Sequence, residues 1–203
     1  MSHDSAERAR LSVRSRSTKE TTIDVRLDLD GAGQVDIVTG LPFFDHMLDQ
    51  LGRHGGFGLV VHAAGDIAID AHHTVEDVGI VLGAAFKDAL GEKIGVRRFA
   101  SGIYPLDEAA IEVVLDLSGR PYLHYDIELP GQKILGSPPF DPQLIEEFWR
   151  AFVQQADLTL HLTMLRGRNT HHVIEAVFKG VARTLRDAVR VEGTTVPSTK
   201  GSL

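Results

Sequence analysis

The chain has 203 residues, enough for one large domain or two small fused units to bury a core without stabilising cross-links. Hydrophobic residues make up 43% and charged residues 24% of the chain, which is ordinary for a globular protein and excludes collagen, coiled coils and long disordered regions. The absence of cysteine excludes disulfides, thiolate zinc sites, iron–sulfur clusters and a cysteine nucleophile. Any bound metal must therefore be held by nitrogen and oxygen atoms.

Charge and hydropathy also limit the partners of the chain. A net charge of −7 argues against nucleic acid or an anionic membrane as the main partner, but leaves a small anionic substrate open. The longest uncharged apolar stretch, residues 78–86, is far shorter than the roughly 18 residues of a membrane helix. The first eight residues lack the basic start and apolar core of a signal peptide, so we expect a cytoplasmic protein.

In the first half of the chain, apolar residues change from a two-residue to a helical period. We expect, in order, antiparallel β-structure from residue 10 that ends in a turn at 30–33, a short helix from Pro42 to the Gly55-Gly56 pair, a strand at 59–61, and a long helix at 72–90 that ends at Gly91.

The second half gives a similar succession. We expect strands at 111–117 and 122–129, a helix at 142–155, a strand at 158–162, a long helix at 171–191, and an irregular tail at 194–203.

The two halves are related by an internal repeat. At an offset of 99 residues Leu59 matches Leu158 and His62 matches His161, and residues 72–76 match residues 171–175 in a shared His-His-x-x-Glu motif. We therefore predict an α+β fold of two repeated β-rich half-units, each with a mixed or antiparallel sheet packed on helices, related by pseudo-two-fold symmetry. The predicted halves are residues 1–93 and 94–203, packed as one compact unit, with a substrate-binding tail at the end of the second.

The repeated motif has the chemistry of a metal site. On a helix, adjacent histidines diverge by about 100°, whereas the glutamate lies one turn from either of them. Each His-His pair is thus suited to ligate two different ions, one on each flank of its helix. A donor set of imidazole and carboxylate suits Mn, Fe, Ni, Co or Zn, and more than four such ligands favour octahedral Mn²⁺.

Other interpretations exist for these histidines. A single His-His pair at a helix start is as consistent with solvated surface residues as with a metal site. Its glutamate can equally serve to place a favourable negative charge at the helix N-terminus. Recurrence in register favours the metal site. His62, His161 and His124 are interpreted as structural, His54 is left open, and His46 is unusually polar for its apolar helix.

Three segments are suited to bind an anion. They are Arg97-Arg98, Arg120 within residues 118–121, and residues 198–201 in the tail. Guanidinium groups and backbone amides beside glycine and serine suit phosphate oxygens. Each segment alone is a weak signal, because exposed arginine and lysine are common.

Four segments together resemble one enzyme family. Residues 40–48, 72–77, 168–179 and 197–201, in this order, closely resemble imidazoleglycerol-phosphate dehydratase, and the similarity runs from about residue 10 to the C-terminus. The resemblance implies a manganese-dependent lyase of histidine biosynthesis that removes water from imidazole glycerol phosphate to give imidazole acetol phosphate. It further implies two Mn²⁺ per subunit and a homo-oligomer of 24 subunits built from trimers, with no nucleic-acid or membrane partner.

The resemblance also implies the site residues. The metal ligands it implies are His46, His72, His73, Glu76, His171, His172 and Glu175, with Glu147 at the place of a further ligand that is histidine in many members. The substrate contacts it implies are Glu20, His46, Met47, Leu48, Asp49, Gln50, Leu51, Gly52, Arg53, His54, His72, His73, Glu76, Arg98, Arg120, His171, His172, Lys179, Ser198, Thr199 and Lys200. We expect Glu20, His46, His72 and His171 to be catalytic, with Glu20 transferring a proton.

Metal ions suit the implied dehydration, because the carbon proton that is lost is not acidic and cations on the ring nitrogens lower the barrier by stabilising an imidazolate. Two other functions remain open from the residues. The same ions can activate water on a phosphoester in a dinuclear metallohydrolase. A metal-storage protein is the non-catalytic alternative, which the cationic segments suited to phosphate argue against.

Overall fold

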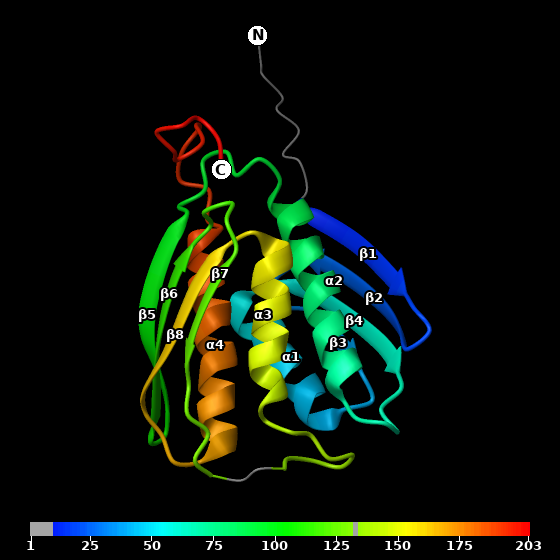
Figure 1. Cartoon of the computed structure of the whole chain (residues 1–203). Helices are drawn as coiled ribbons and strands as arrows, with labels where there is room; N and C mark the ends of the chain where they lie inside the picture. The colour runs from blue at the N-terminus through cyan, green and yellow to red at the C-terminus, as the bar shows by residue number, and fades with distance from the viewer. Residues whose placement is uncertain (1–9, 132–133) are drawn as a thin grey trace.

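The computed structural model describes residues 10–131 and 134–203; the first eight residues, on which the signal-peptide expectation rests, lie outside this part. Two four-stranded sheets form the outer layers of the molecule, and the helices lie between them (Figure 1). In the first half the elements are β1 (Leu11–Ser17), β2 (Thr21–Asp28), β3 (Val35–Val38), α1 (Pro42–Gly55), β4 (Gly58–Gly65) and α2 (His72–Leu90). In the second half they are β5 (Phe99–Leu106), β6 (Ala109–Asp116), β7 (Tyr122–Asp126), α3 (Leu144–Ala156), β8 (Thr159–Arg166) and α4 (Thr170–Ala188).

The two sheets have the same topology. Their strand orders are β1-β2-β4-β3 and β5-β6-β8-β7, so each strand of the first half has a counterpart at the same place in the second. Three strands of each sheet are antiparallel, and the fourth, β3 or β7, is parallel to its neighbour because a helix carries the chain across. The predicted α+β fold of two similar half-units is confirmed, and each sheet is mixed.

Apolar periodicity places the helices between the sheets. The long helix α2 packs on β1, β2 and β4 of its own sheet and against α3 of the other half, while α4 packs on β5 and β6 and against α1. The side chains of Phe148, Trp149, Phe152 and Phe178 pack against one another in the centre and are fully buried. From the first half, Phe44 packs against Phe148 and Phe86 packs against Phe152. Burying each such side chain contributes about 1.5–3 kcal/mol, so these contacts help to hold the two halves together.

Helices α1, α2 and α4 begin within one residue of their predicted starts, whereas α3 begins at Leu144, two residues after its predicted start. The range His72–Leu90 of α2 is the predicted one, and α1 ends at Gly55 with Gly56 in the left-handed conformation that favours glycine (φ +69°). The predicted helix at 171–191 ends earlier, at Ala188, because residue 190 onwards leaves the helix to run beside the start of the second sheet.

Two strands were not predicted, β3 and β5, and both lie at sheet edges. Edge strands bury little, so alternation is weak: no residue of β5 is fully buried, and Gly102 and Pro105 are unfavourable for strands. On the edge strand β1 the apolar face is the outer one, because Val13 is 67% exposed while Ser12 faces the helices. The predicted strand at 122–129 ends at Asp126.

No helix within residues 10–131 and 134–203 is both long and apolar enough to cross a membrane.

Candidate functional site

The first turns of α2 and α4 carry the two His-His pairs. Before α4, the side chain of Asn169 accepts hydrogen bonds from the backbone N–H groups of His171 (2.9 Å) and His172 (3.4 Å). Before α2, Asp70 accepts a hydrogen bond from the N–H of His72 (2.8 Å). Asn169 is the N-cap of α4, whereas Asp70 lies one residue before the N-cap of α2. Both side chains satisfy N–H groups that have no partner within the helix.

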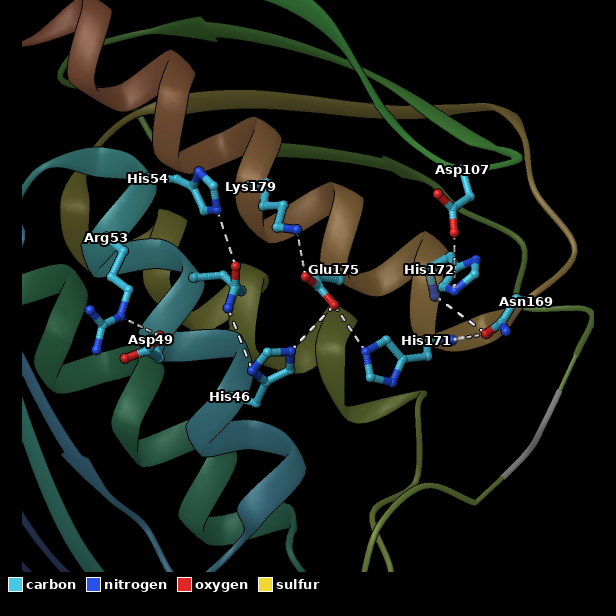
Figure 2. A network of polar contacts seen from close by, with 11 residues as sticks. His46, Asp49, Arg53, His54, Asp107, Asn169, His171, His172, Glu175 and Lys179 are labelled. Carbon is cyan, nitrogen blue, oxygen red and sulfur yellow. Dashed lines mark hydrogen bonds and ion pairs between the residues drawn. The ribbon is translucent and has the colours of Figure 1, made fainter.

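Three predicted ligands meet in one cluster, shown in Figure 2. The Nε2 atoms of His46 and His171 lie 3.3 Å and 2.9 Å from one carboxylate oxygen of Glu175, and Lys179 donates to the other oxygen at 2.6 Å. One ligand atom from each of His46, His171 and Glu175 lies within 4.8 Å of the other two. This spacing and this donor set fit a divalent transition metal.

The charge of Glu175 is kept by its neighbours. Its side chain is only 11% exposed, and burial alone would raise its pKa. Hydrogen bonds from Lys179 and His171, together with the charges of Lys179 and His46, outweigh that effect and hold the pKa of Glu175 below its usual value. The cluster therefore contains an ionised carboxylate, which is the form that binds a cation.

A row of polar side chains follows the exposed side of α1. Gln50 lies between His46, whose Nδ1 atom is 3.5 Å away, and His54, whose Nε2 atom is 3.1 Å away. Burial and the nearby Lys179 and Arg183 lower the pKa of His54, which favours the neutral ring. Histidine and glutamine thus line one helix face leading away from the cluster.

The predicted substrate segment on α1 divides between two environments. His46, Asp49, Gln50, Arg53 and His54 are exposed or partly exposed, whereas Met47, Leu48, Leu51 and Gly52 are buried in the core. The four buried residues belong to the core of this chain and do not line its surface.

The other His-His pair lies apart from this cluster. The Nε2 atom of His72 is 3.8 Å from Glu76, and the Nδ1 atom of His73 is 3.0 Å from Asp66 and 3.9 Å from Glu20. The hydrogen bond to Asp66 raises the pKa of His73. His72 and Glu147 both line a cavity of about 600 Å³ between the start of α2 and α3.

His172, the second histidine of α4, contacts a different element. Its Nδ1 atom lies 2.8 Å from Glu108 in the hairpin between β5 and β6, and its Nε2 atom lies 3.9 Å from Asp107. This contact, together with backbone hydrogen bonds to the carboxylate, lowers the pKa of Glu108 to about 2, and it raises the pKa of His172. Sequence reasoning missed Asp66 and Glu108, because nothing in the pattern indicated that these turns fold back onto the helix starts.

The three cationic segments meet at one cavity. Arg98, Arg120 and residues 197–200 line a space of about 740 Å³, together with residues 118–119 and 202–203. Asp116 at 2.7 Å and the carbonyl oxygen of Pro197 at 2.7 Å hold the guanidinium group of Arg98 in place. Arg97 does not line this cavity; it lies 3.9 Å from Glu192.

The cavity and the histidine cluster lie at opposite ends of the molecule. The N–H of Arg98 bonds to the carbonyl oxygen of Ala188, at the end of α4, whereas His171 lies in the first turn of the same helix. At about 1.5 Å per residue, His171 and Ala188 are about 25 Å apart. Figure 1 shows the tail at one end of the molecule and the starts of α2 and α4 at the other.

A family model and the curated relatives that this chain resembles belong to the same family. A family model described as imidazoleglycerol-phosphate dehydratase matches residues 39–185. The imidazoleglycerol-phosphate dehydratase of Acidothermus cellulolyticus is 54% identical over 190 residues, which cover 93% of this chain and 90% of the relative.

Solved structures agree with this result. Imidazoleglycerol-phosphate dehydratase from Staphylococcus aureus superposes with a TM-score of 0.79 at 36% identity, covering 91% of this chain and 99% of that one. The enzyme from Pyrococcus furiosus, in complex with (S)-C348, gives 0.80 at 35% identity, covering 94% and 100%. The chain therefore belongs to the imidazoleglycerol-phosphate dehydratase family, and so to the hydro-lyases.

Proposed function

We propose that this chain removes water from imidazole glycerol phosphate to give imidazole acetol phosphate, a step of histidine biosynthesis, with two Mn²⁺ ions per subunit. The observation that carries the proposal is the convergence of His46, His171 and Glu175, in a chain that belongs to this family. Family membership supports the reaction, and the nitrogen and oxygen donors support the metal.

The proposed ligands come from both repeats. His46, His171 and Glu175 form one set; His72, His73, Glu76, His172 and Glu147 supply the others. When bound, the ions provide positive charge that stabilises negative charge developing on the imidazole ring. The neighbouring Lys179 keeps Glu175 ionised and so ready to bind a cation.

Glu20 is the proposed proton-transfer group. It lies in the turn between β1 and β2, with its side chain 55% exposed and 3.9 Å from His73. In the reaction the bond from the carbon next to the imidazole ring to its hydroxyl oxygen breaks, and Glu20 accepts the proton of the neighbouring carbon. The hydroxide and this proton leave together as water. The enol that remains becomes the ketone when its hydroxyl loses a proton and the carbon next to the ring gains one.

The cavity at the other end is the proposed phosphate site. Arg98, Arg120, Ser198, Thr199 and Lys200 combine guanidinium, ammonium and hydroxyl donors, which suit phosphate oxygens. A hydrogen bond to a charged group contributes about 1.5–3 kcal/mol, so these contacts supply binding energy at the phosphate, which takes no part in the bond changes.

A complete site in this proposal needs more than one copy of the chain. The substrate is an imidazole ring, three carbons and a phosphate, which is far too short to span the roughly 25 Å that separate the two sites along α4. The phosphate cavity of one subunit must then meet the histidines of another. The family resemblance gives the form of the assembly we propose, 24 subunits built from trimers.

A turnover assay tests the reaction and its alternatives. Protein loaded with Mn²⁺ is given imidazole glycerol phosphate, and the ketone product is measured beside inorganic phosphate. We expect ketone without phosphate release. Release of phosphate would instead indicate a metallohydrolase, and bound Mn²⁺ without turnover would indicate metal storage.

A further inference from the structure

Each repeat supplies one carboxylate to the Nδ1 atom of its second histidine. In the first half Asp66 is 3.0 Å from the Nδ1 atom of His73, and in the second half Glu108 is 2.8 Å from that of His172. The two carboxylates come from different places in the repeat. Asp66 follows β4, whereas Glu108 lies in the hairpin before β6. The same contact is therefore made twice by different routes.

The connection before each long helix explains the difference. Residues 66–71 join β4 to α2 and include Asp66 and Asp70, whereas the shorter connection 167–169 joins β8 to α4 as Gly-Arg-Asn, with no carboxylate. In the second half the carboxylate comes instead from the hairpin, at the place that Glu20 occupies in the first, just before the second strand of its sheet. Asp66 is thus the close partner of the Nδ1 atom of His73, at 3.0 Å, whereas the carboxylate of Glu20 lies 3.9 Å from the same atom.

We infer that Asp66 and Glu108 are positioning residues that select the tautomer of His73 and His172 and aim the Nε2 atom of each ring at a metal ion; this rests on the proposed metal-dependent function. An ionised carboxylate only accepts hydrogen bonds, so a neutral ring beside it carries its proton on Nδ1. Its Nε2 lone pair is then free to ligate.

Glu108 is held more firmly than Asp66. One of its carboxylate oxygens accepts hydrogen bonds from the backbone N–H groups of Arg168 (3.2 Å) and Asn169 (2.8 Å), and the other faces His172. Asn169 in turn caps α4 at His171 and His172. The hairpin, the connection before α4 and the His172 ring therefore form one hydrogen-bonded unit.

This arrangement gives Glu108→Gln a specific effect. Its amide oxygen still accepts the two backbone hydrogen bonds, so the NH₂ group turns towards Nδ1 of His172 and can only donate. The ring must then accept at Nδ1 and carry its proton on Nε2, which blocks the ligand atom. Asp66→Asn is less constrained, because no backbone N–H group among the described residues donates to the Asp66 carboxylate, and the amide oxygen of the variant can turn towards His73.

The test measures Mn²⁺ binding by electron paramagnetic resonance of the free ion, on the parent, Glu108→Gln, Asp66→Asn and a control. The control is Asp36→Asn, which removes a carboxylate 2.9 Å from Nε2 of His62, a pair outside the proposed site. We expect Glu108→Gln to weaken binding about 10- to 100-fold, Asp66→Asn to weaken it less, and Asp36→Asn to leave it unchanged. Circular dichroism in chelator, expected to be the same for all four proteins, shows that the variants fold.

Equal affinity of folded Glu108→Gln and Asp36→Asn would overturn the inference while the proposed metal dependence stood. A parent that binds no Mn²⁺ would overturn the proposed metal dependence, and this inference with it. The melting temperature of Glu108→Gln in chelator separates two causes of weaker Mn²⁺ binding. A purely structural loss at Glu108 would lower this melting temperature, whereas a change of tautomer at His172 would not.

Discussion

The Nε2 atom of His171 lies 2.9 Å from a carboxylate oxygen of Glu175, one turn further along α4. The same oxygen lies 3.3 Å from His46, on a helix of the other half. The sequence places His171 and Glu175 on one face of α4, and the fold adds His46, which is 129 positions from Glu175 in the chain. The first prediction concerns this pair.

Replacing His171 by alanine is expected to abolish turnover and lower bound Mn²⁺ while leaving the subunit folded. The side chain is 40% exposed, so its loss removes a ligand without opening a large core cavity. Turnover, metal content and circular dichroism are measured together. His161→Ala serves as the control, since that ring lies on β8 and contacts His124 and Tyr122. Full metal occupancy and normal activity in His171→Ala would contradict the site.

Replacing Lys200 by alanine is expected to raise the KM for the substrate about 10- to 100-fold, which corresponds to one charge-assisted contact of about 1.5–3 kcal/mol. Inorganic phosphate should also inhibit less well. Arg97→Ala, which removes a nearby cation outside the cavity, should change neither value. Unchanged binding of substrate and phosphate by Lys200→Ala would exclude the tail from the phosphate site.

Mixing the two defective variants His171→Ala and Lys200→Ala tests whether the site is shared between subunits. His171→Ala lacks the cluster but has an intact cavity, and Lys200→Ala has the reverse defect. If a site combines the two ends of different chains, co-assembled particles contain some sites with both parts intact. We expect substrate turnover at low concentration to exceed the average of the separate variants. Turnover equal to that average would place each complete site within one chain.

Chelation tests the link between metal and assembly. If the ions join ligands of different subunits, their binding energy also stabilises the assembly. Removing the metal should reduce the particle towards trimers, and Mn²⁺ should restore both size and activity. Light scattering with and without chelator measures this change. A particle of unchanged mass after verified metal removal would show that protein contacts alone hold it.

The ion pair between Asp88 and Arg14 predicts a pH-dependent stability. Hydrogen bonding from Arg14 lowers the pKa of Asp88 below its ordinary value of 3.8, despite partial burial. A carboxyl group whose pKa is lower in the folded than in the unfolded protein stabilises the fold at pH values above its unfolded-state pKa. This stability is lost as the pH falls through the folded-state pKa. Asp88→Asn should therefore lower the melting temperature at pH 7, and the difference should vanish in acid.

The control for that variant comes from the repeat. Asp187 matches Asp88 at the end of α4, and the described residues show no ion pair for its side chain. Asp187→Asn should leave the melting temperature nearly unchanged across the pH range. Equal effects of the two substitutions would mean that the pair with Arg14 contributes nothing specific.

Local patterns in the sequence determined much of this fold. The helical period of residues 72–90, the stop signal at Gly55-Gly56 and the recurrence of His-His-x-x-Glu depend on neighbours within a few turns, so they can be read directly. The same signals identified His171 and Glu175 as partners, because residues four apart on a helix share a face.

Tertiary structure decided what depends on distant parts of the chain. The edge strands β3 and β5 are held by pairing with buried neighbours, so their own residues carry little pattern. Glu108 meets His172 because a hairpin folds back onto a helix start 64 residues away. The cationic segments share a cavity, and that cavity lies a helix length from the histidines, because α4 spans the molecule between them. The sequence names the chemical groups, and the packing of the two halves sets the distances between them.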